Sequence, residues 1–293
     1  MHSYISSPGN TVRILDEYGI RLRKNLGQNF LIDTNSAKKI AGCGAVGPED
    51  IILEIGSGIG GLTEIMLPLV KKVICIEIDK QLIKAFRDIF SRDLKKKSKL
   101  ELIQADALKL DYCNITSTYN INKVVSNLPY SIAAPLLIKM ITEGNQVKKM
   151  VLTVQKDIAD RILSPVGGKN YSSYTVKANF LADFNYCFKI SRNCFIPRPF
   201  VDSSVIELTR RDEKLMENPG FDIVDFFNFI DSCFSHRRKK LINSLVQSNP
   251  AYCYKVELII KLLSGIGKDK NVRAQELTVK DYIYLYKNLI PNI

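Results

Sequence analysis

The amino-acid sequence predicts an α/β domain built on a parallel sheet, followed by a smaller domain made only of helices. Short β-branched runs alternate with helical periodicity from about residue 34 to residue 163, which is the order of βαβ units. After about residue 212 only helical patterns remain. We therefore expect residues 1–212 to form the α/β domain and residues 213–293 to form the helical one.

The individual elements follow from the same patterns. Strands are expected at 50–56, 71–79, 99–106, 123–130 and 149–155. Helices are expected around them at 35–46, 62–70, 81–90, 134–142 and 156–163, and in the second domain at 221–234, 237–247 and 256–267. Parallel sheets bind ligands at the carboxyl ends of their strands, so polar residues at those ends are the first candidates for a site.

Composition narrows the possible chemistry. The chain has 42 Lys and Arg residues against 30 Asp and Glu residues, a net charge of +12, which favours a polyanionic partner such as nucleic acid. With only two histidines, a histidine-based triad, a multi-histidine metal site and a histidine general base are nearly excluded. The seven cysteines include no CxxC pair, and we expect no metal site.

The N-terminal residues lack the charged and then apolar order of a signal peptide. No run approaches the ~18 uninterrupted apolar residues that a membrane span requires. We therefore expect a cytoplasmic monomer that does not associate with a membrane.

A glycine-rich loop follows the strand expected at 50–56. Its glycines, Gly56, Gly58 and Gly61, have the spacing G-x-G-x-x-G, which permits a tight turn and lets backbone N–H groups approach a bound nucleotide. Glu77 ends the next strand, where a carboxylate can accept hydrogen bonds from both ribose hydroxyls. These residues alone would serve a NAD site equally well.

A third acid, Asp106, ends the following strand, where it could accept hydrogen bonds from the exocyclic amine of an adenine. A helix-capping aspartate is the competing interpretation of this residue. Glu54, just before the glycine loop, is weaker evidence, because it could simply bond amides of the loop. A glycine loop with acids on consecutive strands favours an S-adenosylmethionine site over a dinucleotide site.

The segment "KNLGQNFLID", residues 24–33, is too polar for a core helix and too aromatic for a tail. We interpret it as a lid over the cofactor, with Gln28, Asn29 and the backbone of Leu31 as contacts. Capping of the helix that follows is the alternative interpretation, and the two are compatible.

The fourth strand runs into "NLPY", residues Asn127, Leu128, Pro129 and Tyr130. Pro129 has no N–H and favours an extended backbone at Leu128, which would leave the Leu128 carbonyl free to accept a hydrogen bond. The Asn127 side chain adds a second acceptor. Two convergent acceptors suit an exocyclic amine with two N–H groups, and Tyr130 could lie flat against the ring that carries it.

This arrangement indicates how an unreactive amine could be methylated. Two acceptors would favour a pyramidal nitrogen whose lone pair points at a sulfonium methyl group. The protein would then contribute positioning and electrostatics rather than a strong base, which agrees with the shortage of histidine. A structural turn with a satisfied asparagine and a core tyrosine is the alternative interpretation.

Seven motifs together resemble one known family. In chain order they are "NLGQNFLID", "EIGSGIGGLT", "IEID", "QADAL", "NLPY", "CFIPRPFVDSSVIEL" and "HRRKKLINSL". Over residues 21–247 the chain is similar to the ribosomal RNA adenine dimethyltransferases, and specifically to their small-subunit, kasugamycin-sensitivity branch. The resemblance implies a Rossmann-like enzyme that uses S-adenosylmethionine to dimethylate two adjacent adenines near the 3′ end of small-subunit (16S) ribosomal RNA in a partly assembled subunit.

The resemblance also implies roles for particular residues. The cofactor contacts of the family fall on Asn29, Leu31, Gly56, Glu77, Asp106 and Asn127, and its target-adenine site falls on residues 127–130. Phe195 would stack on the other face of a flipped base, since stacking contributes about 1–3 kcal/mol per base. A core position is the competing interpretation of Phe195, and the prolines that follow it favour exposure.

The sequence departs from the family pattern at three places. Ser57 stands where proline is frequent, and alanines follow "NLPYSI" where small hydroxyl residues are usual. Phe200 occupies a position that is often basic, which could weaken a phosphate contact. None of these differences removes a reacting group.

The helical domain carries a basic cluster, Arg237, Arg238, Lys239 and Lys240, at an expected helix start. The helix dipole disfavours cations there and favours a phosphate, so we expect the cluster to contact ribosomal RNA. A solvated charged face is the alternative.

Three other functions compete with a small-subunit RNA methyltransferase. One is a large-subunit adenine methyltransferase of the macrolide-resistance type, and another is a non-catalytic RNA-binding assembly or transcription factor built on such a domain. The third is a NAD-dependent oxidoreductase, which is disfavoured because no hydride-transfer acid or base is evident and "NLPY" would have no role.

Overall fold

The computed structural model describes residues 4–21, 27–96, 99–144, 146–211 and 220–289. The chain divides into two compact units, the first made of Met1–Ala159 and Phe184–Arg210 and the second of Asp160–Asp183 and Arg211–Ile293. The expected boundary at residue 212 lies outside the described residues. The grouping of Asp160–Asp183 with the C-terminal helices was not predicted, because this segment follows the last parallel strand without a break in composition.

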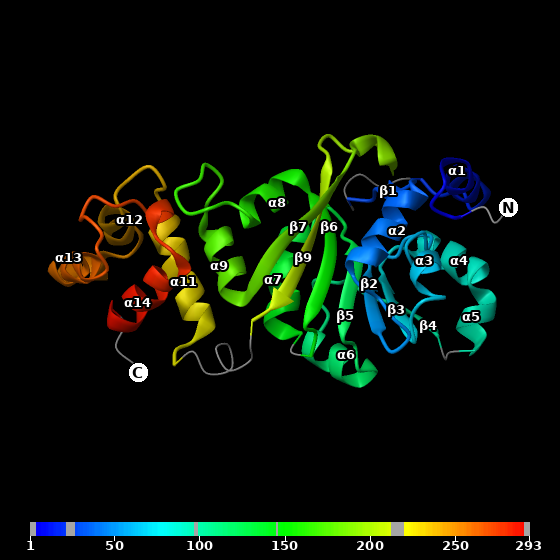
Figure 1. Cartoon of the computed structure of the whole chain (residues 1–293), viewed down its shortest axis with the longest axis horizontal. Helices are drawn as coiled ribbons and strands as arrows, with labels where there is room; N and C mark the ends of the chain where they lie inside the picture. Colours follow the sequence, from blue (N-terminus) through cyan, green and yellow to red (C-terminus); the bar gives the residue numbers. More distant parts are fainter. Residues whose placement is uncertain (1–3, 22–26, 97–98, 145, 212–219, 290–293) are drawn as a thin grey trace. The chain divides into compact units, whose positions relative to one another are not determined.

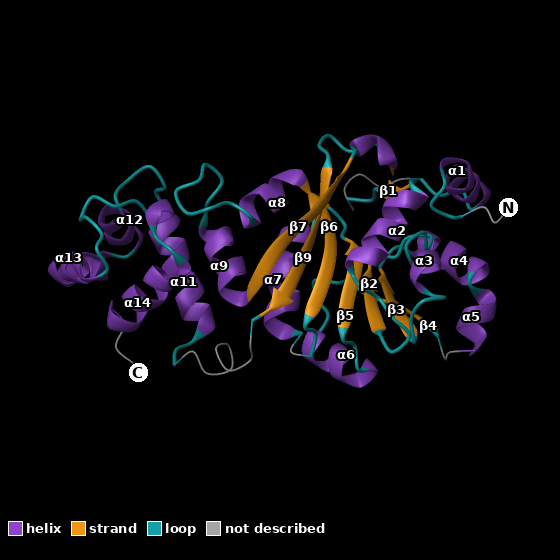
Figure 2. Cartoon of the chain, in the orientation of Figure 1, coloured by secondary structure: helices purple, strands orange, loops and turns teal. Residues whose placement is uncertain are grey.

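A mixed seven-stranded sheet forms the centre of the first unit (Figure 2). Its five parallel strands are β2 (Ile51–Ile55), β3 (Lys72–Glu77), β4 (Leu100–Gln104), β5 (Lys123–Asn127) and β6 (Lys149–Gln155). They lie in the order β4-β3-β2-β5-β6, and all five correspond to predicted strands. The predicted α/β class is therefore confirmed.

The far edge of the sheet was not predicted. Strand β9 (Ser203–Arg210) pairs antiparallel with β6, and β7 (Ala182–Ile190) lies beside β9. A separate short pair joins β1 (Phe30–Leu31) to β8 (Phe195–Ile196), with Leu31 opposite Phe195. This pair ties the segment expected to be a lid to the segment between β7 and β9 (Figure 1).

The central strands are apolar on both faces, as expected where helices cover a parallel sheet. Ile52, Leu53, Val73 and Ile74 are fully buried. The helices of this unit are α1 (Pro8–Glu17), α2 (Thr34–Cys43), α3 (Thr63–Met66), α4 (Lys80–Ile89), α5 (Ser91–Lys96), α6 (Tyr112–Tyr119) and α7 (Ala133–Glu143), and α8 (Lys156–Ile162) runs from this unit into the second.

Aspartates fix where three helices of this unit begin. Asp33, Asp79 and Asp111 are the N-caps of α2, α4 and α6, and the carboxylate of each accepts a backbone N–H of the first helical turn. Such caps stabilise a helix by about 1 kcal/mol. The helix α4 thereby begins three residues after Glu77, the last residue of β3.

The second unit is helical apart from the first residues of β7. It contains α9 (Ser173–Leu181), α11 (Ile223–Phe234), α12 (Leu241–Ser248), η3 (Pro250–Lys255), α13 (Val256–Gly265), η4 (Ala274–Glu276) and α14 (Val279–Leu289). Its core is aromatic: the ring centroid of Phe226 lies 5.0 Å from those of Phe180 and Phe221 and 5.2 Å from that of Tyr286. Within the residues that the structure describes, no helix has the length and apolar character needed to cross a membrane.

Candidate active site

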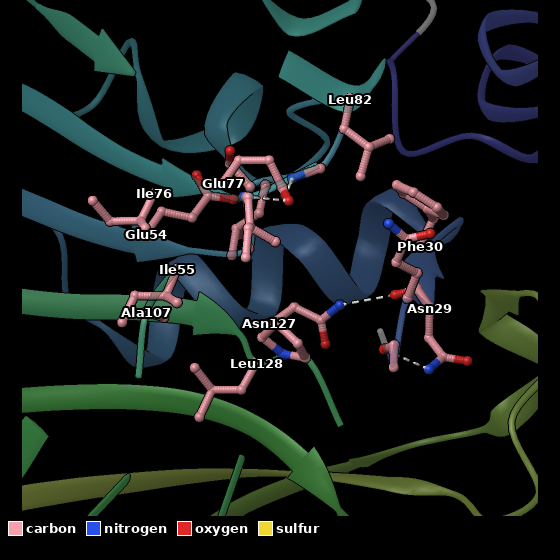
Figure 3. A pocket seen from close by; sticks show the side chains of 18 of the residues that line it. Asn29, Phe30, Glu54, Ile55, Ile76, Glu77, Leu82, Ala107, Asn127 and Leu128 are labelled. Carbon is pink, nitrogen blue, oxygen red and sulfur yellow. Dashed lines mark hydrogen bonds between the residues drawn. The ribbon is translucent and has the colours of Figure 1, made fainter. Parts of the chain in front are cut away.

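A cavity of about 330 Å³ opens at the carboxyl ends of β2, β3, β4 and β5 (Figure 3), a size that suits a small-molecule ligand. It brings together most residues that the sequence identified as site candidates. Those that line it are Gln28, Asn29, Leu31, Gly56, Gly58, Glu77, Asp106, Asn127, Leu128 and Pro129. Tyr130 and Phe195 are not among its lining residues.

The glycine loop shapes the cavity by close approach to neighbouring segments. Gly56 and Gly58 have φ angles of +70° and +58°, a region that glycine enters without steric cost. A Cβ on Gly56 would lie 2.9 Å from Pro129 Cγ, and one on Gly58 would lie 2.9 Å from Phe30 Cε1. The N–H groups of Gly56 and Gly58 are occupied by Ile76 O and Glu77 Oε2. These two N–H groups therefore bond within the protein, and the two glycines shape the cavity by leaving room beside Pro129 and Phe30.

Glu77 is held rigidly at the end of β3 by backbone donors. Its Oε1 accepts the N–H groups of Ile78 and Asp79 at 2.8 and 3.0 Å, and its Oε2 accepts that of Gly58 at 3.0 Å. A carboxylate offers about four acceptor positions, so one remains for a ligand hydroxyl. Burial raises the pKa of Glu77, and the three N–H donors oppose that rise.

Asp106 makes one local hydrogen bond and also lines the cavity. Its Oδ1 accepts the backbone N–H of Leu108 at 3.0 Å, a local bond across a turn. The helix-capping interpretation is wrong, because the next helix, α6, begins at Tyr112 with Asp111 as its N-cap. No donor among the described residues reaches its Oδ2, and Asp106 lines the cavity. This oxygen is therefore available to the amine of a bound adenine.

Asn127 is the residue whose geometry most clearly indicates a ligand. Its Nδ2 donates to the Asn29 carbonyl at 3.1 Å (Figure 3). This contact joins two segments that are 98 residues apart, and no local sequence pattern predicts it. Its Oδ1 is buried and has no hydrogen-bond partner within the described part of the chain. A buried acceptor left unpaired is costly, so this orphan oxygen fits a donor supplied by a ligand.

The Leu128 carbonyl provides a second acceptor beside the first. The Leu128 N–H donates to Thr153 O at 3.2 Å, which fixes the peptide orientation. Among residues 4–21, 27–96, 99–144, 146–211 and 220–289 no donor reaches the Leu128 carbonyl. Pro129 follows and packs against Gly56, so the glycine loop and the "NLPY" segment meet at one wall of the cavity.

The expectation that Phe195 is exposed is wrong. Phe195 is 2% exposed and belongs to the hydrophobic core, because β8 pairs with β1 and turns its side chain inward. Tyr130 is also buried, and its hydroxyl bonds the Ser203 hydroxyl. The two rings lie 6.2 Å apart at 67°, so they do not form a parallel pair. A flipped base could be sandwiched between them only after these rings reorient.

Glu54 occupies a buried position beneath the glycine loop. It does not bond loop amides; its Oε2 accepts the Thr63 hydroxyl at 2.6 Å and the Cys75 thiol at 3.8 Å. Burial raises the pKa of Glu54 to about 8, and the charge of Glu77 adds to the rise. The carboxyl of Glu54 is thus predominantly protonated at neutral pH.

This raised pKa makes a prediction about stability. In the folded state Glu54 keeps its proton up to a pKa of about 8, whereas in the unfolded state it releases the proton near its ordinary pKa of 4.5. The contribution of this proton to the free energy of unfolding is therefore complete below pH 4.5 and is lost as pH rises through about 8. Substitution Glu54→Gln removes the titration. We expect the wild type to lose at least about 1 kcal/mol relative to this variant between pH 5.5 and 8.5, since one unit of pKa shift corresponds to about 1.4 kcal/mol.

Urea unfolding at a series of pH values measures this difference. Glu101→Gln is the matched control, because Glu101 is a strand residue that pairs with Lys72 at 2.8 Å near the surface. Parallel pH profiles for the wild type and Glu54→Gln would show that Glu54 titrates normally.

The basic cluster of the helical unit immediately precedes α12, which begins at Leu241, four residues later than the helix predicted over 237–247. The Arg237 side chain is hydrogen-bonded within that unit: it donates to Gln275 Oε1 at 3.1 Å and to the carbonyls of Gly168 and Lys169. Arg238, Lys239 and Lys240 are exposed, and within the described ranges none of the four residues pairs with a carboxylate. Lys239 Nζ donates to Gln247 Oε1 at 2.7 Å, and all three exposed side chains can reach phosphates in solvent.

The described residues contain no group of three or more His, Cys, Asp and Glu side chains arranged for a metal ion.

The cavity fits S-adenosylmethionine: Asp106 Oδ2 suits an adenine amine, Glu77 suits a ribose hydroxyl, and Asn127 Oδ1 needs a donor. A sheet of this topology with these strand-end residues defines a Rossmann-like methyltransferase. The model of the family "Ribosomal RNA adenine dimethylase" matches residues 19–289, and the chain belongs to this family.

Curated relatives match over their full length. The chain is 34% identical over 295 residues to "Ribosomal RNA small subunit methyltransferase A" of Geobacillus thermodenitrificans, with 99% of each chain covered. It is 35% identical to the protein of the same name from Halothermothrix orenii, covering 99% of this chain and 95% of that one.

Solved structures agree with this assignment. A dimethyladenosine transferase from Plasmodium falciparum superposes with a TM-score of 0.73 at 26% identity, over 89% of this chain and 98% of that one. The 23S rRNA methyltransferase ErmE superposes with a TM-score of 0.62 at 23% identity, over 88% and 98% of the two chains, and it shares the fold. Predictions of an rRNA adenine methyltransferase that uses S-adenosylmethionine are confirmed.

Proposed function

We propose that this protein dimethylates the exocyclic amines of two adjacent adenines near the 3′ end of small-subunit ribosomal RNA, acting on a partly assembled subunit. The observation that carries the proposal is the pair of acceptors at the end of β5, Asn127 Oδ1 and the Leu128 carbonyl, which lack protein donors among the described residues. An adenine amine has two N–H groups to offer them.

The cofactor supplies an electrophilic methyl group on a sulfonium sulfur. Asn127 and Leu128 hold the two amine hydrogens and thereby direct the nitrogen lone pair away from the purine ring. Neither acceptor is a base at neutral pH, so the contribution of the protein is orientation and electrostatic stabilisation. Burial raises the pKa of Tyr130 to about 12, and the phenol stays neutral beside the target position.

The exposed residues Arg238, Lys239 and Lys240 support an RNA-binding role for the helical unit. They precede α12, whose N-terminal N–H groups favour an anion. Together with the net charge of +12, they would make binding strongly salt-dependent, with log K falling by roughly 0.7 to 0.9 per log unit of salt for each phosphate neutralised. We further propose that the protein acts in the cytoplasm as a monomer.

The substrate assignment is tested by offering two RNAs with radiolabelled S-adenosylmethionine. Undermethylated small subunits should become labelled, and the label should co-migrate with dimethyladenosine after digestion. Bare large-subunit RNA should stay unlabelled. Label in large-subunit RNA alone would assign the macrolide-resistance activity, and no label despite cofactor binding would assign a non-catalytic role.

A further inference from the structure

Phe200 presents its ring almost entirely to solvent. It is 91% exposed, and no large apolar side chain among the described residues of the first unit is more exposed. The next is Tyr186 at 55%. A single exposed apolar residue needs no explanation by itself, so the surroundings of Phe200 decide what it can do.

The backbone that carries Phe200 is fixed. Arg192 Nη1 donates to the Phe200 carbonyl at 3.2 Å, and the Arg192 N–H donates to Asp202 Oδ1 at 2.9 Å. Asp202 also pairs with Lys189 at 2.7 Å, and its carbonyl accepts the Lys156 N–H at 3.0 Å. The ring therefore projects from a loop that needs little ordering when a partner binds, which favours affinity.

The same loop is attached to the target-base site at both ends. Phe195 pairs with Leu31, whose segment lines the cofactor cavity. The Ser203 hydroxyl bonds the Tyr130 hydroxyl at the end of "NLPY". Phe200 lies three residues before Ser203, a backbone span of at most about 11 Å. It is thus within reach of nucleotides next to a target adenine.

The charge around Phe200 is positive. Arg192 and Arg198 are exposed, and neither forms an ion pair with a carboxylate within the described residues. The carboxylate of Asp202 forms an ion pair with Lys189, and this interaction holds the pKa of Asp202 below its usual value. An exposed aromatic ring among guanidinium groups is the combination by which proteins bind single-stranded nucleic acid.

We propose that Phe200 stacks on a base that flanks the target adenine and so positions the RNA strand at the cavity, while the neighbouring arginines attract its phosphates. This inference rests on the proposed function. An aromatic face is sequence-tolerant, so one side chain could serve both adjacent adenines in successive reactions.

A substitution series at Phe200 separates stacking from other contacts. Phe200→Tyr and Phe200→Trp keep a flat ring, Phe200→Leu keeps apolar bulk, and Phe200→Lys offers a phosphate contact. With undermethylated small subunits we expect KM near the wild-type value for the two aromatic variants. For the leucine and lysine variants we expect KM to rise roughly 5-fold to 100-fold, the effect of losing one stacked base. The kcat value and the Kd for S-adenosylmethionine should remain unchanged throughout.

Tyr186→Leu is the matched control, because Tyr186 is the next most exposed large apolar residue of the same unit; its KM should not change. A leucine variant with wild-type KM would overturn the inference and indicate an apolar contact with a ribosomal protein. A lysine variant with wild-type KM would overturn it in favour of a phosphate contact. If the wild type itself failed to methylate small subunits, the proposed function would fail first, and that outcome is distinct from wild-type activity with indifferent Phe200 variants.

Discussion

Replacing Asn127 by alanine is expected to lower kcat for adenine methylation by at least about 100-fold, the size of the loss when one preorganised polar contact to a reacting group is removed. The substitution deletes Oδ1, the buried acceptor that has no partner within the described residues. It also deletes the bond from Nδ2 to the Asn29 carbonyl, which positions the lid segment. Because the other cofactor contacts remain, the Kd for S-adenosylmethionine should rise less than about 10-fold.

Steady-state kinetics on undermethylated small subunits, with calorimetric titration of the cofactor, would separate the two effects. Asn114→Ala is the control: Asn114 is an exposed residue of α6 whose backbone N–H, retained in alanine, makes the capping bond to Asp111. A kcat for Asn127→Ala within threefold of the wild type would show that this amide does not hold the reacting amine.

Replacing Glu77 by glutamine is expected to weaken cofactor binding by roughly 10-fold to 100-fold, since a hydrogen bond to a charged group contributes about 1.5–3 kcal/mol. An amide has one acceptor oxygen in place of two, whereas Glu77 already accepts three backbone N–H groups from Gly58, Ile78 and Asp79. The variant must therefore lose a backbone bond as well as the acceptor position left for a ribose hydroxyl.

Calorimetric titration of S-adenosylmethionine measures this loss, and thermal unfolding checks that the variant is folded at the assay temperature. Glu101→Gln serves as the control, because Glu101 lies on the neighbouring strand β4 and does not line the cavity. A folded Glu77→Gln protein that binds the cofactor with wild-type affinity would remove Glu77 from the cofactor site.

The parallel half of the fold could be predicted because its signals are local. Each of β2 to β6 is a short run rich in Val, Ile or Leu, and a helix follows it in the chain. The antiparallel edge formed by β7 and β9 carries weaker signals. Three of the nine β7 positions, Asp183, Asn185 and Lys189, are polar or charged, so the sequence of this strand lacks the continuous apolar run of a buried strand.

The strand-end residues of the site were predicted for the same local reason. Each of these residues lies at the end of a strand: Glu77 and Asn127 are the last residues of β3 and β5, and Gly56 and Asp106 come just after β2 and β4. Parallel strands bring their carboxyl ends to one edge. Their hydrogen-bond partners could not be predicted where they come from distant segments. The contact of Asn127 with the Asn29 carbonyl spans 98 residues, and nothing in either short stretch specifies it.

Phe195 shows how long-range pairing overrides a local expectation. The prolines after it suggested exposure, but pairing of β8 with β1 buries the ring. In this segment Phe200, five residues further along the chain, is exposed instead. In the basic cluster, Arg237 is drawn into bonds within its own unit by Gly168, Lys169 and Gln275, which lie far away in sequence.

The central claim is that one cavity holds the methyl donor and delivers its methyl group to an adenine amine at Asn127. The most direct test is a pulse–chase experiment: the protein is loaded with radiolabelled S-adenosylmethionine and mixed with undermethylated small subunits and an excess of unlabelled cofactor. We predict that label appears in methylated adenosine of small-subunit RNA with the wild type and is chased off unused with Asn127→Ala. Label lost entirely to the chase with the wild type, under conditions where total methylation proceeds, would contradict the account.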